Sequence, residues 1–198
     1  AMTVTAGSIK LEEAGTLGST VSMSGGTLDA DESLTLSGAL TQAGAITIDV
    51  ATGKTLTYSG ASLSLGAYTL TMSGGGTLSN TNALDLNNAS SKLLLNSITV
   101  DNVSTSLASL GLDVDANSTL SSLTVGHTTP VSIASGKTLS GAITLTAGSI
   151  KLGETGTLAS AVSMSGGTLD ADETLTVSGA LSQAGSITID VATGKTLT

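Results

Sequence analysis

The sequence predicts an all-β fold, a parallel β-helix or β-solenoid in which the chain winds through about ten coils of roughly 20 residues each. Three observations lead to this prediction. Apolar and polar residues alternate in short segments, turn-forming residues separate these segments at regular intervals, and a long stretch of the chain occurs twice with few changes. Alternation indicates strands, and Gly, Asp, Asn and Ser between them indicate turns.

Short strands are expected wherever apolar residues occupy every second position of a segment. Thr, Val and Ile, which favour strands, are common in these segments. No segment shows ten residues of helical periodicity, and the 25 glycines would interrupt helices at frequent intervals. We therefore expect strands at 34–36, 46–50, 63–65, 70–72, 84–86, 98–100, 123–125 and 143–145.

Corners between strands are indicated by an apolar residue, five small or polar residues, and then a leucine. The five intervening residues are rich in Gly, Asp, Asn and Ser, which are typical of turns. Successive pairs begin one coil apart, except for one interval of double length that we interpret as two steps with a corner at Leu86–Leu93. The pairs are Leu11–Leu17, Leu28–Leu34, Val50–Leu56, Met72–Leu78, Val114–Leu120, Ile133–Leu139, Leu152–Leu158, Leu169–Leu175 and Val191–Leu197.

Stacked coils of this length would form a rod. Neighbouring strands lie about 4.8 Å apart, so ten coils would span roughly 45–50 Å. Inward Leu, Ile, Val and Ala would fill a narrow interior. We expect aromatic side chains to be too wide for it, since the chain has only two, Tyr58 and Tyr68.

A long internal repeat organises the chain. Residues 5–57 return as 146–198, offset by 141, with 45 of 53 positions identical. We expect a single solenoid over 1–198, with one long unit of seven coils at 5–145 and the start of a second unit at 146–198. The second copy stops within a unit, which suggests a piece of a longer array. The Asn-rich stretch 79–127 departs from the pattern and is expected to form atypical coils with bulges or longer loops, or alternatively a separate domain.

Composition excludes several classes of function. The formal net charge is −9, with six lysines and no arginine, so binding to nucleic acid is not expected. No run of 18 apolar residues is present, so membrane insertion by a helix is not expected. The chain has no cysteine and one histidine, His127, which argues against thiolate chemistry, His-rich metal sites and a Ser-His-Asp triad.

Acidic residues form the only clusters that suggest chemistry. Asp29, Asp31 and Glu32 recur as Asp170, Asp172 and Glu173. Paired carboxylates could hydrolyse a glycosidic bond or bind Ca²⁺ weakly. A corner must be duplicated along a rod whereas a catalytic site need not be, so we interpret both clusters as turns.

Other motifs also have a structural explanation. Asp113, Asp115 and Asn117 match the start of an EF-hand loop, but Ser118 and Thr124 stand where that loop requires Gly and Glu. The sequence G-K-T at 53–55, 136–138 and 194–196 lacks the first glycine of a phosphate loop. We expect solenoid corners at these positions and a loop at His127, beside the only proline.

Hydroxyl residues flank an apolar residue at 33–35, 55–57, 69–71, 186–188 and 196–198. In a strand, both hydroxyls of such a triplet face the same side, about 6.6–7 Å apart. A flat array of them could order water as an ice surface does. Along the sequence, however, the triplets do not fall at one constant position of the coil, so we expect ordinary strand residues here.

The segments GGTLDADESLTLSG at 25–38, its copy at 166–179, and SGGGTL at 73–78 resemble the Gly-Gly-Thr-Leu strand repeats of autotransporter passengers. The chain as a whole resembles the repetitive stalk of large bacterial surface adhesins. This resemblance implies a secreted, right-handed parallel β-helix that acts as a stalk or adhesive surface.

We therefore expect a structural stalk or spacer of a bacterial cell-surface or secreted adhesin, and not an enzyme. No catalytic, cofactor-binding or metal-binding residues and no cofactor are expected. The expected partners are neighbouring repeats of the same long chain and, in end-to-end association, a second copy. The alternatives are an ice-binding or glycan-binding surface built on Thr-x-Thr arrays, with Tyr58 and Tyr68 as the aromatic candidates for glycan, and a self-assembling extracellular fibre subunit.

Overall fold

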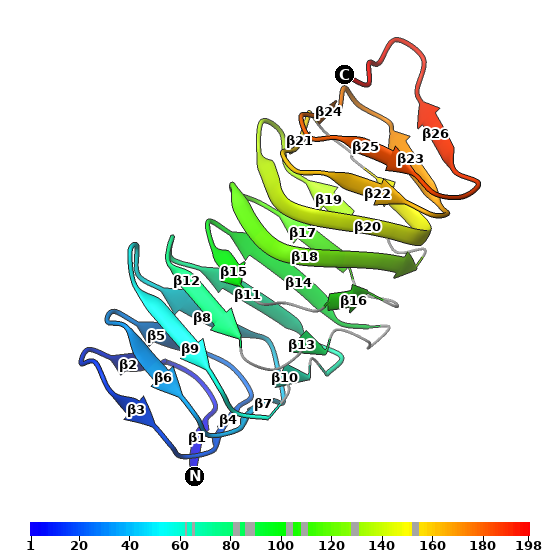
Figure 1. The fold of residues 1–198 in the computed structure, drawn as a ribbon. Coiled ribbons are helices and arrows are strands. Elements are labelled where there is room, and N and C mark those ends of the chain that lie inside the picture. The colour runs from blue at the N-terminus through cyan, green and yellow to red at the C-terminus, as the bar shows by residue number, and fades with distance from the viewer. Residues whose placement is uncertain are drawn as a thin grey trace.

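The computed structural model describes residues 1–61, 63–64, 66–80, 84–85, 90–101, 105–107, 111–127, 131–151 and 155–198. All elements in these ranges are strands, and all strands that pair run parallel. They form a β-solenoid of about eight turns, with the N-terminus and the C-terminus at opposite ends of the rod (Figure 1). The expected all-β, parallel architecture is therefore confirmed.

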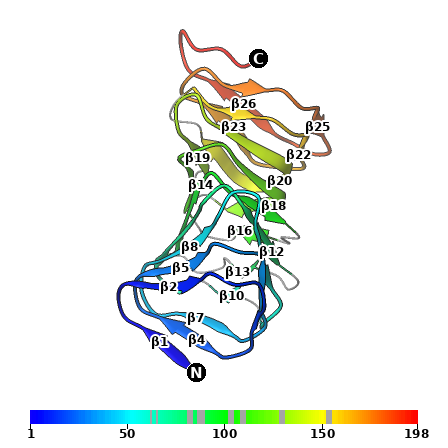
Figure 2. The ribbon, with the colours of Figure 1, turned by 90° about the vertical axis from the view of Figure 1, so that its left-hand side faces the viewer.

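Each turn in the N-terminal half has three sides, each contributing a strand to a different sheet (Figure 2). The first sheet is the shortest and contains β1 (Met2–Val4), β4 (Val21–Met23) and β7 (Leu40–Gln42). The second sheet has seven strands: β2 (Ser8–Leu11), β5 (Thr27–Ala30), β8 (Ile46–Val50), β11 (Thr69–Ser73), β14 (Lys92–Asn96), β17 (Gly111–Val114) and β19 (Val131–Ile133).

The third sheet runs the length of the rod. Its main path contains β3 (Thr16–Leu17), β6 (Leu34–Leu36), β9 (Thr55–Tyr58), β12 (Thr77–Asn80), β15 (Thr99–Asp101), β18 (Ser118–His127), β20 (Thr138–Lys151), β21 (Thr157–Leu158) and β24 (Thr176–Val177). Strands β16 (Thr105–Leu107), β22 (Val162–Met164), β23 (Thr168–Ala171), β25 (Leu181–Gln183) and β26 (Thr188–Val191) branch from this path, and β10 (Leu63–Ser64) pairs separately with β13 (Leu84–Asp85). All the segments expected to be strands contain strand residues wherever the structure describes them.

The two copies of the long repeat are joined through one strand. Strand β20 spans the junction at residues 145 and 146 and pairs with β18 on the side of the first copy. On the other side it pairs in succession with β21, β22 and β23 of the second copy. The second copy therefore continues the same rod without a break in the hydrogen-bonded ladder.

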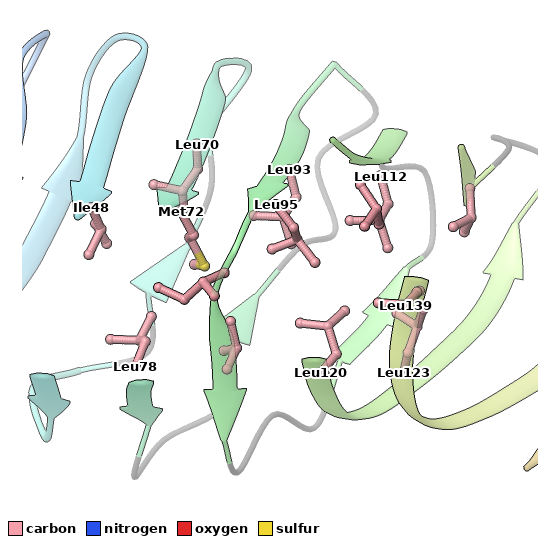
Figure 3. Packing of buried hydrophobic residues seen from close by; sticks show 14 of the residues in the cluster. Ile48, Leu70, Met72, Leu78, Leu93, Leu95, Leu112, Leu120, Leu123 and Leu139 are labelled. Atoms are coloured by element: carbon pink, nitrogen blue, oxygen red, sulfur yellow. The ribbon is translucent and has the colours of Figure 1, made fainter. Parts of the chain in front are cut away.

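The core consists of apolar side chains stacked in columns along the rod. In the second sheet, Ile9, Leu28, Ile48, Met72, Leu95, Val114 and Ile133 occupy successive rungs. In the third sheet, Leu34, Leu56, Leu78, Val100 and Leu120 do the same. Figure 3 shows Met72 and Leu95 reaching inward from one side and Leu78 and Leu120 from the other. Their burial supplies the main driving force for folding.

The register between coils corrects the expected corner at Leu28–Leu34. Leu28 lies beside Ile9, whereas Leu11 lies beside Ala30, so residues 29 and 30 belong to β5 and not to a corner. Alternation leaves Leu28 and Ala30 as equally valid inward positions two residues apart. Only pairing with the neighbouring coil decides which one aligns with Leu11.

The corner expected at Leu86–Leu93 is also wrong in its described half. Leu93 lies within β14, and Leu95 is the residue that aligns with Met72 and Val114. The corner that follows β14 contains Ser97, whose φ of 60° is left-handed. Leu86 lies outside the described residues. The run of three leucines hid the alternation that would have revealed this strand.

The Asn-rich stretch 79–127 is part of the solenoid where it is described. Strands β14 and β17 belong to the second sheet, and β15 and β18 to the third. The pairing of β18 with β20 shifts register between Thr119 and Ser122 and again between Val125 and Gly126. Strand β18 is therefore irregularly paired in this stretch, and the described strands β14, β15, β17 and β18 belong to the sheets of the solenoid.

Tyr58 overturns the expectation that aromatic side chains are too wide for the interior. Its side chain is only 3% exposed, and its hydroxyl accepts a hydrogen bond from the backbone N–H of Leu40 at 3.2 Å. Tyr58 takes the rung between Leu36 and Asn80, and Asn80 is also buried. The interior thus accommodates two polar side chains, Tyr58 and Asn80, on adjacent rungs beside the leucine column.

Candidate functional site

Hydroxyl side chains form a regular array on the outer face of the third sheet. Thr55, Thr77, Thr99 and Thr119 occupy consecutive rungs of one column. Thr35, Thr57 and Ser79 occupy consecutive rungs of a second column, two residues further along each strand. We call these seven residues the hydroxyl array. Rungs of a sheet lie about 4.8 Å apart and the two columns about 6.6–7 Å apart, so the array is a two-dimensional grid.

The array faces outward because the residues between its members face inward. Leu56 and Leu78 are 1% and 3% exposed, which fixes Thr55, Thr57, Thr77 and Ser79 on the solvent side of their strands. The central positions are leucines except for Val100, and each aligns with the central residue of the next coil. The column of leucines inside therefore holds the column of hydroxyls outside in register.

The expectation that the hydroxyl triplets do not share one position of the coil is confirmed, although some of them stack directly. The triplets at 33–35 and 55–57 stack directly, and 77–79 and 99–101 follow in the same register. The triplet at 69–71 belongs to the second sheet and therefore lies at a different position of the coil. The sequence obscured the array because similar triplets also occur outside the third sheet, as at 69–71, and because Ser79 and Asp101 replace threonine in the second column.

A polar groove of about 300 Å³ adjoins the C-terminal end of the array, at Thr99 and Thr119. It is lined by backbone and side-chain groups of Ser97, Thr99, Asn117, Ser118, Thr119 and Thr138, among others. Its walls are fixed by hydrogen bonds: the Ile98 N–H donates to Ser118 Oγ at 3.3 Å, and the Thr138 N–H donates to Asn117 Oδ1 at 3.0 Å. The lining offers neutral hydroxyl and amide groups, which suit water or sugar hydroxyls and supply neither acid nor base.

Lysines pair with several carboxylates of the duplicated acidic cluster. Lys10 Nζ lies 2.9 Å from Asp31 and 3.1 Å from Glu12, and Lys54 Nζ lies 2.5 Å from Glu32. In the second copy, Lys195 pairs with Glu173. Asp29 lies in β5 and its carboxyl is close to that of Asp31, whereas Glu32 is turned to Lys54. These contacts favour the structural interpretation of both clusters.

The carboxyl of Asp29 has a raised pKa because of its surroundings. It aligns with Lys10 on one side and with Asp49 on the other, along the outer face of the second sheet. Partial burial raises its pKa, and the nearby carboxylates of Asp31 and Asp49 raise it further, while Lys10 opposes them. Lys10 itself has a raised pKa, chiefly through its hydrogen bond to Asp31.

Asp113 lies on a strand and not in a metal-binding loop. Its carboxylate is 2.5 Å from Lys92 Nζ, and Asp115 and Asn117 lie in the corner that follows β17. Asn117 Oδ1 is engaged by the backbone of the next coil. Among the described residues, no group of three or more His, Asp and Glu side chains is placed to hold a metal ion.

The G-K-T sequences form turns, as predicted. In each, the lysine N–H donates to the carbonyl three residues earlier, at 2.9 Å for Lys54 and Lys137 and 3.0 Å for Lys195. The glycines have φ between 67° and 78°. No helix follows these turns, so their N–H groups are not arranged as in a phosphate loop.

The remaining singled-out residues lie in different surroundings. His127 ends β18 and aligns with Gly148, so its backbone is in a strand and not in the expected loop, while residues 128–130 lie outside the described part. Of the two tyrosines considered for glycan stacking, Tyr58 is buried and Tyr68 is 41% exposed. A paired aromatic platform is therefore excluded.

The comparisons with known proteins add no assignment: no family model, no curated protein and no solved structure matches this chain. Among the described residues there is also no helix with the length and hydropathy of a membrane span. We therefore infer the function from the geometry of the rod and its surface.

Proposed function

We propose that the chain is a rod-forming segment of a bacterial cell-surface or secreted adhesin, where it serves as stalk or spacer and has no catalytic role. The main support is the junction of the two repeat copies at β20, where hydrogen bonding continues from one copy to the next. Each added copy of the 5–145 unit would then lengthen the rod by whole coils. Its neighbouring partners are further repeats of the same kind.

The surface chemistry is consistent with this role. Lys10 and Lys54 pair with carboxylates near the corners, and the net charge of −9 limits lateral association between rods. The resemblance of the 25–38 and 166–179 segments to autotransporter strand repeats supports an extracellular location and a right-handed winding.

Chains with one, two and three copies of the 5–145 unit would test the proposal. If each unit contributes seven coils, small-angle scattering should show the rod lengthening by roughly 34 Å per copy. Chains of equal length in which the second unit is scrambled provide the control. A particle that grows in width and not in length would refute the spacer function. Sequencing the parent gene for an export signal and a surface anchor would test the location separately.

The hydroxyl array favours a second candidate function, the ordering of water at an ice surface. A rigid grid of outward hydroxyls with constant spacing is the feature this activity needs, and five coils of the third sheet supply it. Thermal hysteresis of the whole chain should then fall when Thr77 is changed to Lys. Thr47→Lys, at an outward position of the second sheet, is the matched control. Absence of hysteresis in the unchanged chain would eliminate this candidate.

A further inference from the structure

The polar groove at the end of the hydroxyl array forms where one corner of the solenoid is shorter than its neighbours. The segment 96–99, which joins the inward residues Leu95 and Val100, has four residues. The segments aligned with it on the coils before and after, 73–77 and 115–119, have five. Because the shorter segment follows a tighter path, a recess of about 300 Å³ is left between its neighbours. This volume is at the small end of the range for ligand sites.

Ser97 turns the shorter corner in a backbone conformation that serine rarely adopts. Its φ of 60° is left-handed, and among the described residues it is the only non-glycine residue with a positive φ. The corner of the preceding coil has glycine, Gly75, with a φ of 79°. Glycine at position 97 would relieve the strain, yet the chain has an exposed hydroxyl side chain there, beside the groove. Strain retained at such a position favours a function for the side chain.

Two columns of neutral polar side chains line the groove on three successive coils, whose strands β15, β18 and β20 follow one another along the rod (Figure 1). The first column consists of aligned residues of these strands: Thr99, Thr119 and Ser140. The second column lies two residues earlier on each coil: Ser97, Asn117 and Thr138. Coils are about 4.8 Å apart, so the same pair of groups recurs at that interval along the groove. None of the lining residues is charged or aromatic.

Backbone N–H groups from all three coils are hydrogen-bonded within the chain. The N–H groups of Thr99 and Thr119 donate to carbonyls of the preceding coil, at 3.0 and 2.9 Å, and the Thr138 N–H donates to Asn117 Oδ1. These groups are therefore not available to bind an anion. Because Oδ1 of Asn117 is the acceptor, its amide nitrogen is left as a donor. The groove thus offers hydroxyls, which both donate and accept, and one amide donor.

We propose that the groove binds a linear neutral oligosaccharide, which lies along the rod with one sugar ring on each coil. An extended β-linked glycan repeats once per ring, at a length close to the separation of the coils, so successive rings meet the same pair of columns. Sugar hydroxyls donate and accept hydrogen bonds as the Ser and Thr hydroxyls do. Acidic glycans are disfavoured, because the lining has no cation and the net charge of the chain is −9. Such binding goes beyond the stalk function and adds an attachment point on the side of the rod.

Titration of the isotopically labelled whole chain with cellotriose, followed by NMR, tests the proposal. The backbone signals of Ser97 and Thr119 and the side-chain amide signal of Asn117 should shift as the sugar is added. We expect a dissociation constant in the millimolar range, because the groove is open and no aromatic ring stacks on the sugar. Methyl β-glucoside, which has one ring, should bind about tenfold more weakly or less, since it loses the hydrogen bonds of two rings. Trigalacturonic acid, an acidic trisaccharide, should not bind.

Three variants separate the groove from the rest of the surface. Ser97→Gly removes a hydroxyl and relieves the strained φ, so it should weaken binding while the free energy of unfolding stays equal or rises. Thr119→Val keeps the shape of the side chain without the hydroxyl and should weaken binding about two- to tenfold. Thr55→Val makes the same change in the same column of the hydroxyl array, two coils before Thr99, and should leave binding unchanged. Circular dichroism and urea unfolding of each variant would verify folding.

Several results would overturn the proposal. These are an absence of shifts at Ser97 and Asn117 with cellotriose at tens of times the expected dissociation constant, equal binding of cellotriose and trigalacturonic acid, and equal weakening by Thr119→Val and Thr55→Val. Unchanged binding by Ser97→Gly would contradict the function given to the strained serine. The stalk function would survive each of these results, because it depends on stacking of coils and not on the side chains of the groove.

Discussion

Three glycines near one corner allow backbone strain and coil packing to be separated experimentally. Gly53 has a φ of +74° and open space where a Cβ would lie. Gly74 has a φ of +105°, and a Cβ there would lie 2.3 Å from the Val50 carbonyl oxygen. Gly76 has an ordinary φ, but its Cβ would lie 2.5 Å from the Ala51 carbonyl oxygen. Substitution by alanine therefore adds backbone strain alone at Gly53, both strain and a steric clash at Gly74, and a steric clash alone at Gly76.

The structure predicts the order of the three costs in unfolding free energy. A left-handed conformation costs an L-residue about 1–2 kcal/mol, which is the expected effect of Gly53→Ala. Overpacking against fixed neighbours typically costs about 1–3 kcal/mol, which applies to Gly76→Ala. At Gly76 the obstacle is backbone of the adjacent coil, and the Gly76 N–H also donates to the Val50 carbonyl at 2.9 Å, so we expect the upper part of that range. Gly74→Ala combines both effects and should cost about 3–5 kcal/mol.

Urea unfolding followed by circular dichroism measures these differences. The slope of free energy against urea should be compared among the variants, because a change in slope would indicate loss of a single cooperative transition. All three glycines lie in interior coils, so fraying of the end coils affects them alike. If Gly53→Ala and Gly74→Ala lowered the unfolding free energy equally, φ alone would explain both glycines. The close approach of the neighbouring coil at Gly74 would then be irrelevant.

Other substitutions test the core, the buried tyrosine and the carboxylates. Met72→Ala, at a fully buried rung, should cost about 2–5 kcal/mol, while Ile189→Ala on the exposed last coil should cost about 1 kcal/mol or less; equal urea midpoints would contradict the assigned burial. Tyr58→Phe leaves the buried N–H of Leu40 without this acceptor and should cost about 1–3 kcal/mol in thermal or urea unfolding. Because the pKa of Asp29 is raised in the folded state, folding is favoured as the pH falls through that pKa. Asp29→Asn should reduce this increase in unfolding free energy at acidic pH. Urea unfolding curves at neutral and acidic pH would detect the difference.

The acidic corners illustrate how far the sequence could identify a site. Their duplication in both copies of the repeat argued for a structural role, and the contacts of Lys10 with Asp31 and of Lys54 with Glu32 agree with it. The sequence could not reveal these contacts, because the two partners lie a full coil apart along the chain and meet only when coils stack. The hydroxyl array was missed for the same reason: its members share a column only in the observed register.

The sequence by itself determined the strands, the turns at the G-K-T segments and the solenoid architecture, since each follows from a pattern local to one coil. Alternation with a period of two reports which residues can share a face, and the recurrence of similar segments from coil to coil reports that these faces stack. The tertiary structure alone decided the register between coils, because a shift of two residues preserves every inward and outward assignment. In that register Leu28 lies beside Ile9, Tyr58 lies in the core between Leu36 and Asn80, and the threonines of the third sheet are aligned. Packing and hydrogen bonding between coils select it, and these energies depend on the neighbouring coil as much as on the strand itself.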